Sequence, residues 1–267
     1  MAHRSANINV MVQAAQKAAR GLVRDFGEVE QLQVSVKGPS DFVSTADMKA
    51  ERTIKAELKK ARPDWGFLME ESAPEEGRDP RWRWIVDPLD GTTNFLHGIP
   101  HFAISIALEK DREIVAGVVF NPISDELYWA EKGQGAFMND RRMRVSARKD
   151  VGISLFATGI PFRGRPGHAP FLEQMGRVMA VSAGIRRMGV ASLDLAFTAA
   201  GRFDGFWESD LHPWDVAAGV ILVREAGGFV TQIDGGPDPV HSGTILAANQ
   251  TLHAALKDMV ATPPAAA

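Results

Sequence analysis

Acidic side chains follow apolar or turn segments at three places in the chain, and their types suit the binding of a divalent cation. The acids are Glu70 and Glu71 after residues 65–68, Asp87 and Asp90 after residues 84–86, and Asp215 at a predicted helix start. Clustered carboxylates without cysteine ligands form a hard oxygen site, and Mg²⁺ is the natural occupant of such a site. Acids at two strand ends and one helix start can meet in one cleft at the edge of a layered fold.

The segment Asp87-Pro-Leu-Asp90 is the most informative of the three. Pro88 fixes its own backbone angle, so the two carboxylates can diverge to serve different ions. The carbonyl group of Leu89 supplies a further ligand if it lies outside a regular strand ladder. Two Mg²⁺ ions about 3.5–4 Å apart can stabilise both the attacking and the leaving oxygen of a displacement at phosphorus.

The residues that follow, Gly91-Thr-Thr-Asn94, are suited to an anion. A glycine removes side-chain bulk, and a loop that opens a helix presents backbone N–H groups to a phosphate. The hydroxyl group of Thr92 can hold, or help to deprotonate, an attacking water. Acidic metal ligands beside an anion-binding turn together predict a metal-dependent phosphatase.

Each motif also has a plainer structural interpretation. Residues 44–47 fit a helix capping box that explains Asp47, and Asp215 can simply favour the positive end of its helix. Residues 87–91 resemble an ordinary turn, and Glu70 and Glu71 can be solvated loop acids. The conjunction of all these motifs favours the catalytic interpretation.

The composition excludes several other classes of protein. The 267 residues contain no cysteine, which rules out disulfides, thiolate metal sites and cysteine nucleophiles. The formal charge of −3 gives no support to a nucleic-acid-coating surface. The longest apolar run, residues 216–223, is far shorter than the ~20 residues that span a bilayer. We expect a cytoplasmic protein with a small-molecule phosphate ester as its partner and no membrane or nucleic-acid partner.

The pattern of apolar residues predicts a mixed α and β fold in layers. Helices are expected at residues 6–25, 44–61, 170–181, 193–200, 213–225 and 252–260. Strands are expected at residues 66–69, 84–86, 103–108, 115–120, 127–129, 154–158, 203–207, 229–233 and 244–248, and the first five suggest an antiparallel sheet. Residues 34–43 read as a strand pair or an extended loop. We expect a single domain over residues 1–267, with two lobes that divide near residues 145–150.

Four motifs carry a resemblance to a known family. They are Asp41-Phe-Val-Ser-Thr-Ala-Asp47, Glu70-Glu-Ser72, Asp87-Pro-Leu-Asp-Gly-Thr-Thr-Asn94, and Trp214-Asp-Val-Ala-Ala with Glu225-Ala-Gly-Gly228. In this order and separation the chain resembles the inositol monophosphatase family, and bacterial inositol-1-monophosphatases most of all, from about Ile8 to Met259. The resemblance implies an α+β fold with αβαβα layers, a homodimer, and Mg²⁺-dependent hydrolysis of myo-inositol 1-phosphate that lithium inhibits.

The resemblance also implies roles for individual residues, and two or three Mg²⁺ ions. Glu70, Asp87 and the Leu89 carbonyl would hold a first ion, while Asp87, Asp90 and Asp215 would hold a second and Glu70 would help with a third. Thr92, backed by Asp47, would activate the water, with Glu70 counted in the catalytic set. The amides of Gly91 and Thr92 would bind phosphate. The remaining substrate contacts would come from Asp90, Asp215, Glu208 and the segment Gly189, Val190 and Ala191.

Two departures from the family pattern leave alternatives open. Met69 stands where a glycine usually precedes the paired glutamates, and Val190 stands where a small hydroxyl residue is common. The second departure weakens the case for inositol but not for phosphatase chemistry. Histidinol phosphate, fructose 1,6-bisphosphate and a 3′-phosphoadenylate are therefore alternative substrates. Some bacterial relatives are implicated in transcription antitermination, and the basic cluster at residues 141–149 is a candidate partner surface.

Overall fold

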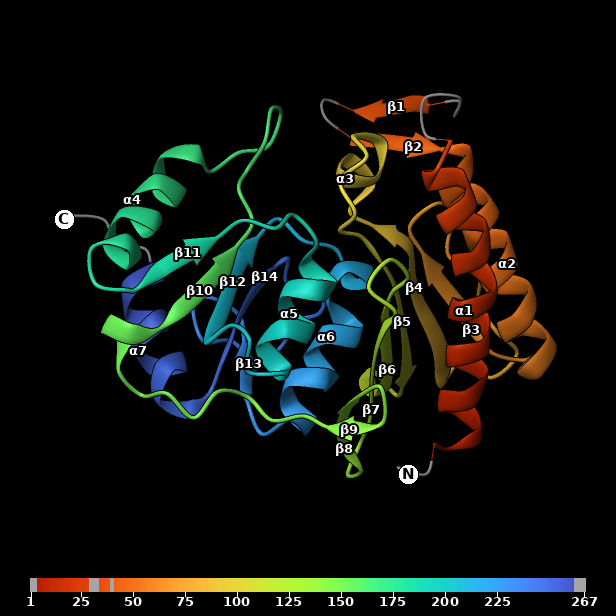
Figure 1. Cartoon of the computed structure of the whole chain (residues 1–267). Helices are drawn as coiled ribbons and strands as arrows, with labels where there is room; N and C mark the ends of the chain where they lie inside the picture. Colours follow the sequence, from red (N-terminus) through yellow and green to blue (C-terminus); the bar gives the residue numbers. More distant parts are fainter. Residues whose placement is uncertain (1–3, 29–33, 39–40, 262–267) are drawn as a thin grey trace.

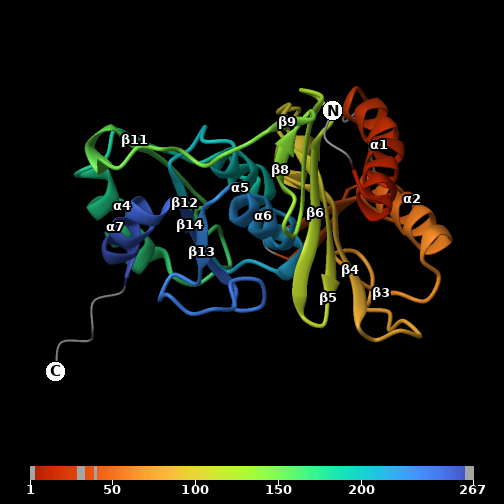
Figure 2. The ribbon, with the colours of Figure 1, turned by 90° about the horizontal axis from the view of Figure 1, so that it is seen from below.

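The structure is a computed structural model that describes residues 4–28, 34–38 and 41–261. In these residues, helices and two large sheets alternate in five layers (Figure 1), which Figure 2 shows from a second direction. The order is a helix pair, a seven-stranded sheet, a second helix pair, a five-stranded sheet and a third helix pair. The predicted αβαβα architecture is therefore confirmed.

The first layer consists of α1 (Ala6–Phe26) and α2 (Thr45–Ala61). Ser5 precedes α1, and its side chain accepts a hydrogen bond from the Ile8 amide at 3.2 Å, which caps the helix. Apolar residues of α1 recur at helical spacing and pack with α2 against the first sheet. A two-stranded ribbon of β1 (Val34–Gly38) and β2 (Asp41–Ser44) leads into α2.

The first sheet has the strand order β3-β4-β5-β6-β7-β8-β9. Its strands are β3 (Gly66–Met69), β4 (Trp82–Asp90), β5 (Ala103–Lys110), β6 (Glu113–Asn121), β7 (Glu126–Glu131), β8 (Gly135–Met138) and β9 (Arg141–Arg142). The sheet is antiparallel as predicted, except that β3 pairs with β4 in parallel. The prediction was wrong there because residues 70–81 return the chain before β4 begins.

The middle layer consists of α5 (Ala191–Ala199) and α6 (Pro213–Glu225), which lie between the two sheets (Figure 2). Residues 216–223 of α6 are all buried, since the helix packs on α5 and contacts strands of both sheets. A helix that is apolar on every side is expected only in such an interior position. The apolar run that the sequence shows at 216–223 is thus the centre of the molecule.

The second sheet has the strand order β11-β10-β12-β14-β13. Its strands are β10 (Leu155–Thr158), β11 (Gly184–Arg186), β12 (Gly205–Ser209), β13 (Phe229–Thr231) and β14 (Thr244–Ala248). The outer helices α4 (His168–Met179) and α7 (Gln250–Val260) cover its far face. Between β9 and the short helix η2 (Val151–Ile153) the chain passes from the first sheet to the second.

The helices of the described residues include none with the length and apolar character needed to cross a bilayer.

Candidate active site

An irregularity in β4 places the first group of predicted site residues. Asp87 pairs with Ser105 and Asp90 pairs with Ala103, so β4 advances three residues while β5 advances two. The extra residue is a bulge that removes Pro88 and Leu89 from the regular ladder. The Leu89 amide donates to Asp87 Oδ1 at 2.9 Å, and the Leu89 carbonyl oxygen lies 3.1 Å from the Thr92 hydroxyl oxygen.

The turn after β4 holds Thr92 beside a buried acid. Gly91 has φ +96°, and the short helix α3 (Thr92–Leu96) begins immediately after it. A Cβ atom at Gly91 would lie 2.8 Å from Val190 Cγ2, so only glycine allows this approach. The Thr92 hydroxyl group donates to Asp47 Oδ1 at 3.1 Å, and Asp47, in the first turn of α2, is fully buried.

Glu70 follows β3 directly, and its amide donates to the carbonyl oxygen of Val86 at 3.2 Å. This bond continues the pairing of β3 with β4 and brings Glu70 next to Asp87. The two side chains form a hydrogen bond. Met69, where the family pattern has a glycine, is the last residue of β3. Its side chain is buried between the first sheet and the first helix layer, so β3 remains regular there.

The carboxylates of Asp90, at the end of β4, and of Asp215 both accept hydrogen bonds from backbone amides at helix N-termini of the middle layer. Asp90 Oδ2 accepts a hydrogen bond from the Ser192 amide at 2.8 Å, in the first turn of α5. Asp215 lies in the first turn of α6, and its Oδ2 accepts from the His212 amide at 2.7 Å. Asp215 therefore caps the N-terminus of its helix, as the plainer interpretation predicts. This hydrogen bond does not exclude metal binding by the same carboxylate.

The carboxylates from the two halves of the chain meet at a cavity of about 530 Å³. Eight predicted residues line it, namely Glu70, Asp90, Gly91, Thr92, Gly189, Ala191, Glu208 and Asp215. Four others lie behind the lining, namely Asp47, Asp87, Leu89 and Val190. Val190 is 1% exposed and its side chain lies against Gly91, so its predicted substrate contact stays a prediction.

Asn94 joins the two halves at the cavity. Its side-chain amide donates to the carbonyl oxygens of His101 at 2.9 Å and Met188 at 3.0 Å. The second bond fixes the segment that leads to Gly189 and Ala191. Ser105 Oγ makes a similar bridge by donating to the Trp214 carbonyl oxygen at 3.2 Å, just before Asp215.

The crowded acids shift one another's proton affinity. Burial raises the pKa of Asp87 well above its usual value, and the neighbouring charges of Glu70, Asp90 and Asp215 raise it further. Burial likewise raises the pKa of Asp215, with Asp90 as the main charged neighbour. The pKa of Asp90 is raised to about 6 by burial, although hydrogen bonds from α5 oppose the shift.

Glu208, at the end of β12, shares this environment. Burial and the charge of Asp90 raise the pKa of Glu208 to about 8, while Arg187 and Arg165 lower it. Perturbed acids gathered in a cleft are typical of functional sites.

The donor chemistry of these residues fits a hard divalent cation. In the ranges that the structure describes, no three Asp, Glu, His or Cys side chains form a ready-made cage for a metal ion. However, Asp87 experiences the charges of Glu70, Asp90 and Asp215 together, and a cation would relieve this repulsion. Carboxylates and a main-chain carbonyl are the ligands that Mg²⁺ accepts.

Several residues at the site were not predicted from the sequence. The additional lining residues are Thr93, His97, Ile160, Phe162, Arg165, Arg187, Asp210 and Leu211. Thr93 lies inside the motif of residues 87–94, and Arg187 lies two residues before Gly189, so both could have been found from the sequence. The residues near 160–165 and 210–211 come from loops whose composition predicts no ligand. A buried carboxylate in α5, Asp194, was also missed, and burial raises its pKa.

Comparisons with known proteins agree on one family. The family model described as "Inositol monophosphatase family" matches residues 4–262. The inositol-1-monophosphatase of Rhizobium meliloti is 60% identical over 260 residues, which cover 97% of this chain and 98% of that protein. The Nus factor SuhB of Escherichia coli is 41% identical and covers 91% of both chains. The crystal structure of extragenic suppressor protein suhB from Bartonella henselae matches with a TM-score of 0.95 at 58% identity, covering 97% of this chain and 100% of that one.

Proposed function

The chain belongs to the inositol monophosphatase family, and from this premise we propose that it is a Mg²⁺-dependent phosphomonoesterase that hydrolyses myo-inositol 1-phosphate to inositol and phosphate. One observation carries the proposal. The Thr92 hydroxyl group, hydrogen-bonded to buried Asp47, lies at a cavity whose walls hold Glu70, Asp90 and Asp215. This arrangement provides a water-activating pair beside a set of cation ligands.

The proposed metal ligands come from both halves of the chain. Glu70, Asp87 and the Leu89 carbonyl oxygen would hold one cation, Asp87, Asp90 and Asp215 would hold a second, and Glu70 would contribute to a third. Mg²⁺ bound there supplies positive charge that polarises the phosphate oxygens and stabilises the leaving alkoxide. The bulge at Pro88 and Leu89 supports this assignment, because it frees the Leu89 carbonyl from the β4–β5 ladder.

The chain's own groups position the reactants. Thr92, oriented by Asp47, holds the attacking water and takes part in removing its proton. The amides of Gly91 and Thr92 at the start of α3 hold the phosphate in line with that water. The bond from phosphorus to the alcohol oxygen breaks as the bond to the water oxygen forms. The leaving alkoxide takes up a proton from solvent, which balances the proton that the attacking water releases.

The alcohol side of the substrate faces Glu208 and the segment Gly189–Ala191. The carboxyl group of Glu208, protonated or ionised, can accept hydrogen bonds from hydroxyl groups, so Glu208 favours a polyol. Val190 offers no hydroxyl group of its own, and its side chain is buried, so we assign it no hydrogen bond from its side chain to the substrate. Glu208 and backbone groups thus support the choice of a polyol substrate.

The family resemblance supports further features of the same proposal. We expect inhibition by lithium, a homodimer and a cytoplasmic location. Size-exclusion chromatography with light scattering tests the dimer, and titration of activity with lithium chloride tests the inhibition.

A panel of phosphate esters ranked by kcat/KM in Mg²⁺ tests the substrate. We expect inositol 1-phosphate to rank above histidinol phosphate, fructose 1,6-bisphosphate and a 3′-phosphoadenylate. A clear preference for one of the last three would retain the chemistry and replace the substrate. Absence of turnover on every ester would refute the phosphatase assignment.

A second candidate function is a protein contact in transcription, and the similarity to a relative named Nus factor SuhB favours it. Arg141 and Arg142 are exposed on β9, at the edge of the first sheet, and are available to a partner. Pull-down of transcription components by the wild type and by an Arg141→Glu, Arg142→Glu variant tests this surface. Unchanged capture by the variant would exclude it.

A further inference from the structure

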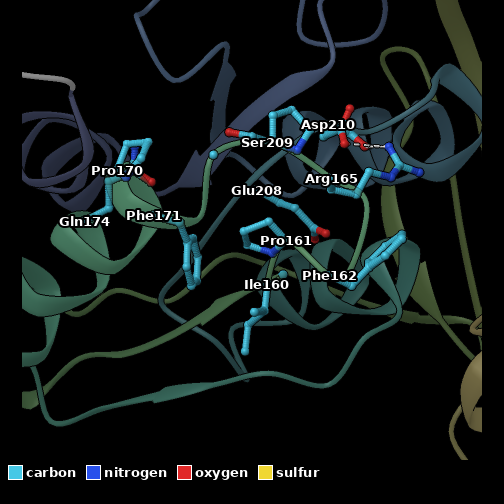
Figure 3. A pocket seen from close by; sticks show the side chains of 13 residues that line it. Ile160, Pro161, Phe162, Arg165, Pro170, Phe171, Gln174, Glu208, Ser209 and Asp210 are labelled. Carbon is cyan, nitrogen blue, oxygen red and sulfur yellow. Dashed lines mark hydrogen bonds and ion pairs between the residues drawn. The ribbon is translucent and has the colours of Figure 1, made fainter. Parts of the chain in front are cut away.

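A second, smaller cavity of about 210 Å³ adjoins the active-site cavity (Figure 3). It lies between the loop of residues 159–167, the first turns of α4 and the end of β12. Both cavities are lined by Ile160, Phe162, Arg165, Glu208 and Asp210. Because Glu208 belongs to both linings, a group held by Glu208 in the larger cavity lies at the entrance to the smaller one.

The cation in the lining of the smaller cavity is already neutralised. Arg165 Nη1 lies 2.7 Å from Asp210 Oδ2, and Figure 3 shows this ion pair. The Arg165 guanidinium group also lies over the Phe162 ring, 5.0 Å from its centroid. A second phosphate group would therefore meet an arginine that already has Asp210 as its anionic partner, which weakens the attraction of this arginine for the phosphate.

The remaining walls combine six apolar residues with the polar residues Ser209 and Gln174. The apolar lining residues are Ile160, Pro161, Phe162, Pro166, Pro170 and Phe171. Gln174 also contributes, but its side-chain amide already donates to the Val260 carbonyl oxygen at 2.8 Å. For comparison, an apolar cavity of about 150 Å³ suffices to bind benzene. The smaller cavity thus has the size and character for one uncharged ring.

Gly159 keeps the entrance open. A Cβ atom at this position would overlap the Glu208 carboxyl group, so that group packs directly on the Gly159 backbone. With the carboxyl group held there, the Glu208 side chain stays at the boundary of the two cavities.

We propose that the smaller cavity is a second substrate subsite, which accepts an uncharged apolar ring carried on the leaving alcohol. The inference rests on the proposed phosphatase function and widens its substrate class. Esters whose alcohol bears such a ring should be better substrates than matched esters without one, because ring burial in the subsite adds binding energy.

Three esters test the subsite in the wild-type chain with Mg²⁺. Ethyl phosphate and 2-phenylethyl phosphate have similar leaving alcohols and differ in the ring, while propane-1,3-diyl bisphosphate replaces the ring with a second anion. We expect kcat/KM for 2-phenylethyl phosphate to exceed that for ethyl phosphate about tenfold, and the bisphosphate to show no such gain. Equal values, a preference for the bisphosphate, or turnover of inositol 1-phosphate alone would overturn the subsite and leave the phosphatase function standing.

Variants at Phe171 locate the effect. Phe171→Ala removes a wall of the smaller cavity, and Phe171→Trp takes up part of its volume, so both should lower the phenylethyl-to-ethyl ratio toward one. Leu172→Ala changes the next residue of α4, which is 67% exposed and outside the lining, and should keep the wild-type ratio. If Phe171→Ala does not fold, the ratio in Phe171→Trp and the comparison of the three esters in the wild type still test the subsite. If the wild type does not hydrolyse inositol 1-phosphate, the proposed function is refuted, and the subsite proposal that rests on it is refuted as well.

Discussion

The Thr92 hydroxyl oxygen lies 3.1 Å from Asp47 Oδ1 and 3.1 Å from the Leu89 carbonyl oxygen. The hydroxyl group has one proton, so these two acceptors compete for it. Asp47 is fully buried and is not part of the cavity lining, and it accepts a hydrogen bond from the lining residue Thr92. The pair therefore joins a buried carboxylate to the position at which a water can be activated.

We expect Asp47→Asn and Thr92→Val each to lower kcat by about 10²–10⁴-fold. Asparagine keeps the size of aspartate and loses the charge, while valine keeps the shape of threonine and loses the hydroxyl group. Because both residues act on the same water, the double variant should fall little below the weaker single variant. Steady-state kinetics measures the effect, and multiplicative losses would show that the two residues act separately.

Asp90→Asn should nearly abolish turnover while the fold is retained. The substitution removes a negative charge from the proposed cation site but keeps an oxygen that can accept the hydrogen bond from the Ser192 amide. Circular dichroism checks the fold, and kcat/KM checks the activity. Asp111→Asn, at an exposed turn residue after β5, is the matched control and should behave as the wild type. Wild-type activity of Asp90→Asn would contradict the proposed mechanism.

Removal of divalent cations should abolish activity, and added Mg²⁺ should restore it. Mg²⁺ should also raise the melting temperature, because a ligand that binds only the folded chain stabilises it, by about 2.7 kcal/mol at 100 times its dissociation constant. Asp87→Asn should reduce this thermal shift, since Asp87 is proposed to ligate two ions. Full activity in a chelator, with no change in melting temperature on adding Mg²⁺, would count against the metal site.

The free energy of unfolding of the metal-free chain should fall as pH rises from about 4.5 to about 8. Glu208 has its pKa raised to about 8 in the folded chain, against 4.5 as the ordinary value. In this window the unfolded chain has released the proton and the folded chain retains it, so rising pH favours unfolding.

Glu208→Gln should remove the contribution of Glu208 to this dependence and stabilise the chain by about 1–2 kcal/mol at pH 8.5, a value reduced for the partial exposure of Glu208. Urea denaturation at pH 5 and pH 8.5 measures the effect. Glu173→Gln, at an exposed position on α4, is the control. Equal pH profiles for the wild type and Glu208→Gln would disprove the assignment.

Gly159→Ala should raise KM for inositol 1-phosphate several-fold and leave kcat less affected. The added methyl group displaces the Glu208 carboxyl group from the Gly159 backbone, while the water-activating pair lies elsewhere. Gly176→Ala is the control, because a Cβ atom there meets open space in the middle of α4. An unchanged KM in Gly159→Ala would mean that Glu208 does not bind the alcohol from its present position.

Much of the fold could be predicted from the sequence, because its long elements have strong periodic patterns. The apolar spacing of α1 and the continuous apolar run of α6 identified both helices. The short strands β8, β9 and β11 were missed, since two to four residues carry too little pattern and form strands only through their neighbours. The parallel pairing of β3 was missed because apolar alternation does not encode strand direction.

The candidate site could be predicted where charge and turn residues coincide, as at Asp87–Asn94. The loop residues Ile160, Phe162 and Arg165 could not, because apolar residues in a loop become a cavity wall only through the packing of distant segments. Val190 shows the opposite case. The sequence places it within a binding segment, and the close approach of Gly91 turns its side chain inward.

Asp215 stands in the first turn of a helix whose following residues are enclosed by both sheets. Such a helix cannot tilt or slide without opening two interiors at once, so this acid has the rigidity of the interior rather than the freedom of a surface loop. Distant changes inside the protein are therefore communicated to the cleft. A poorly fitting side chain at Val220, which is buried in the same helix, should therefore displace the carboxylate of Asp215 and slow catalysis.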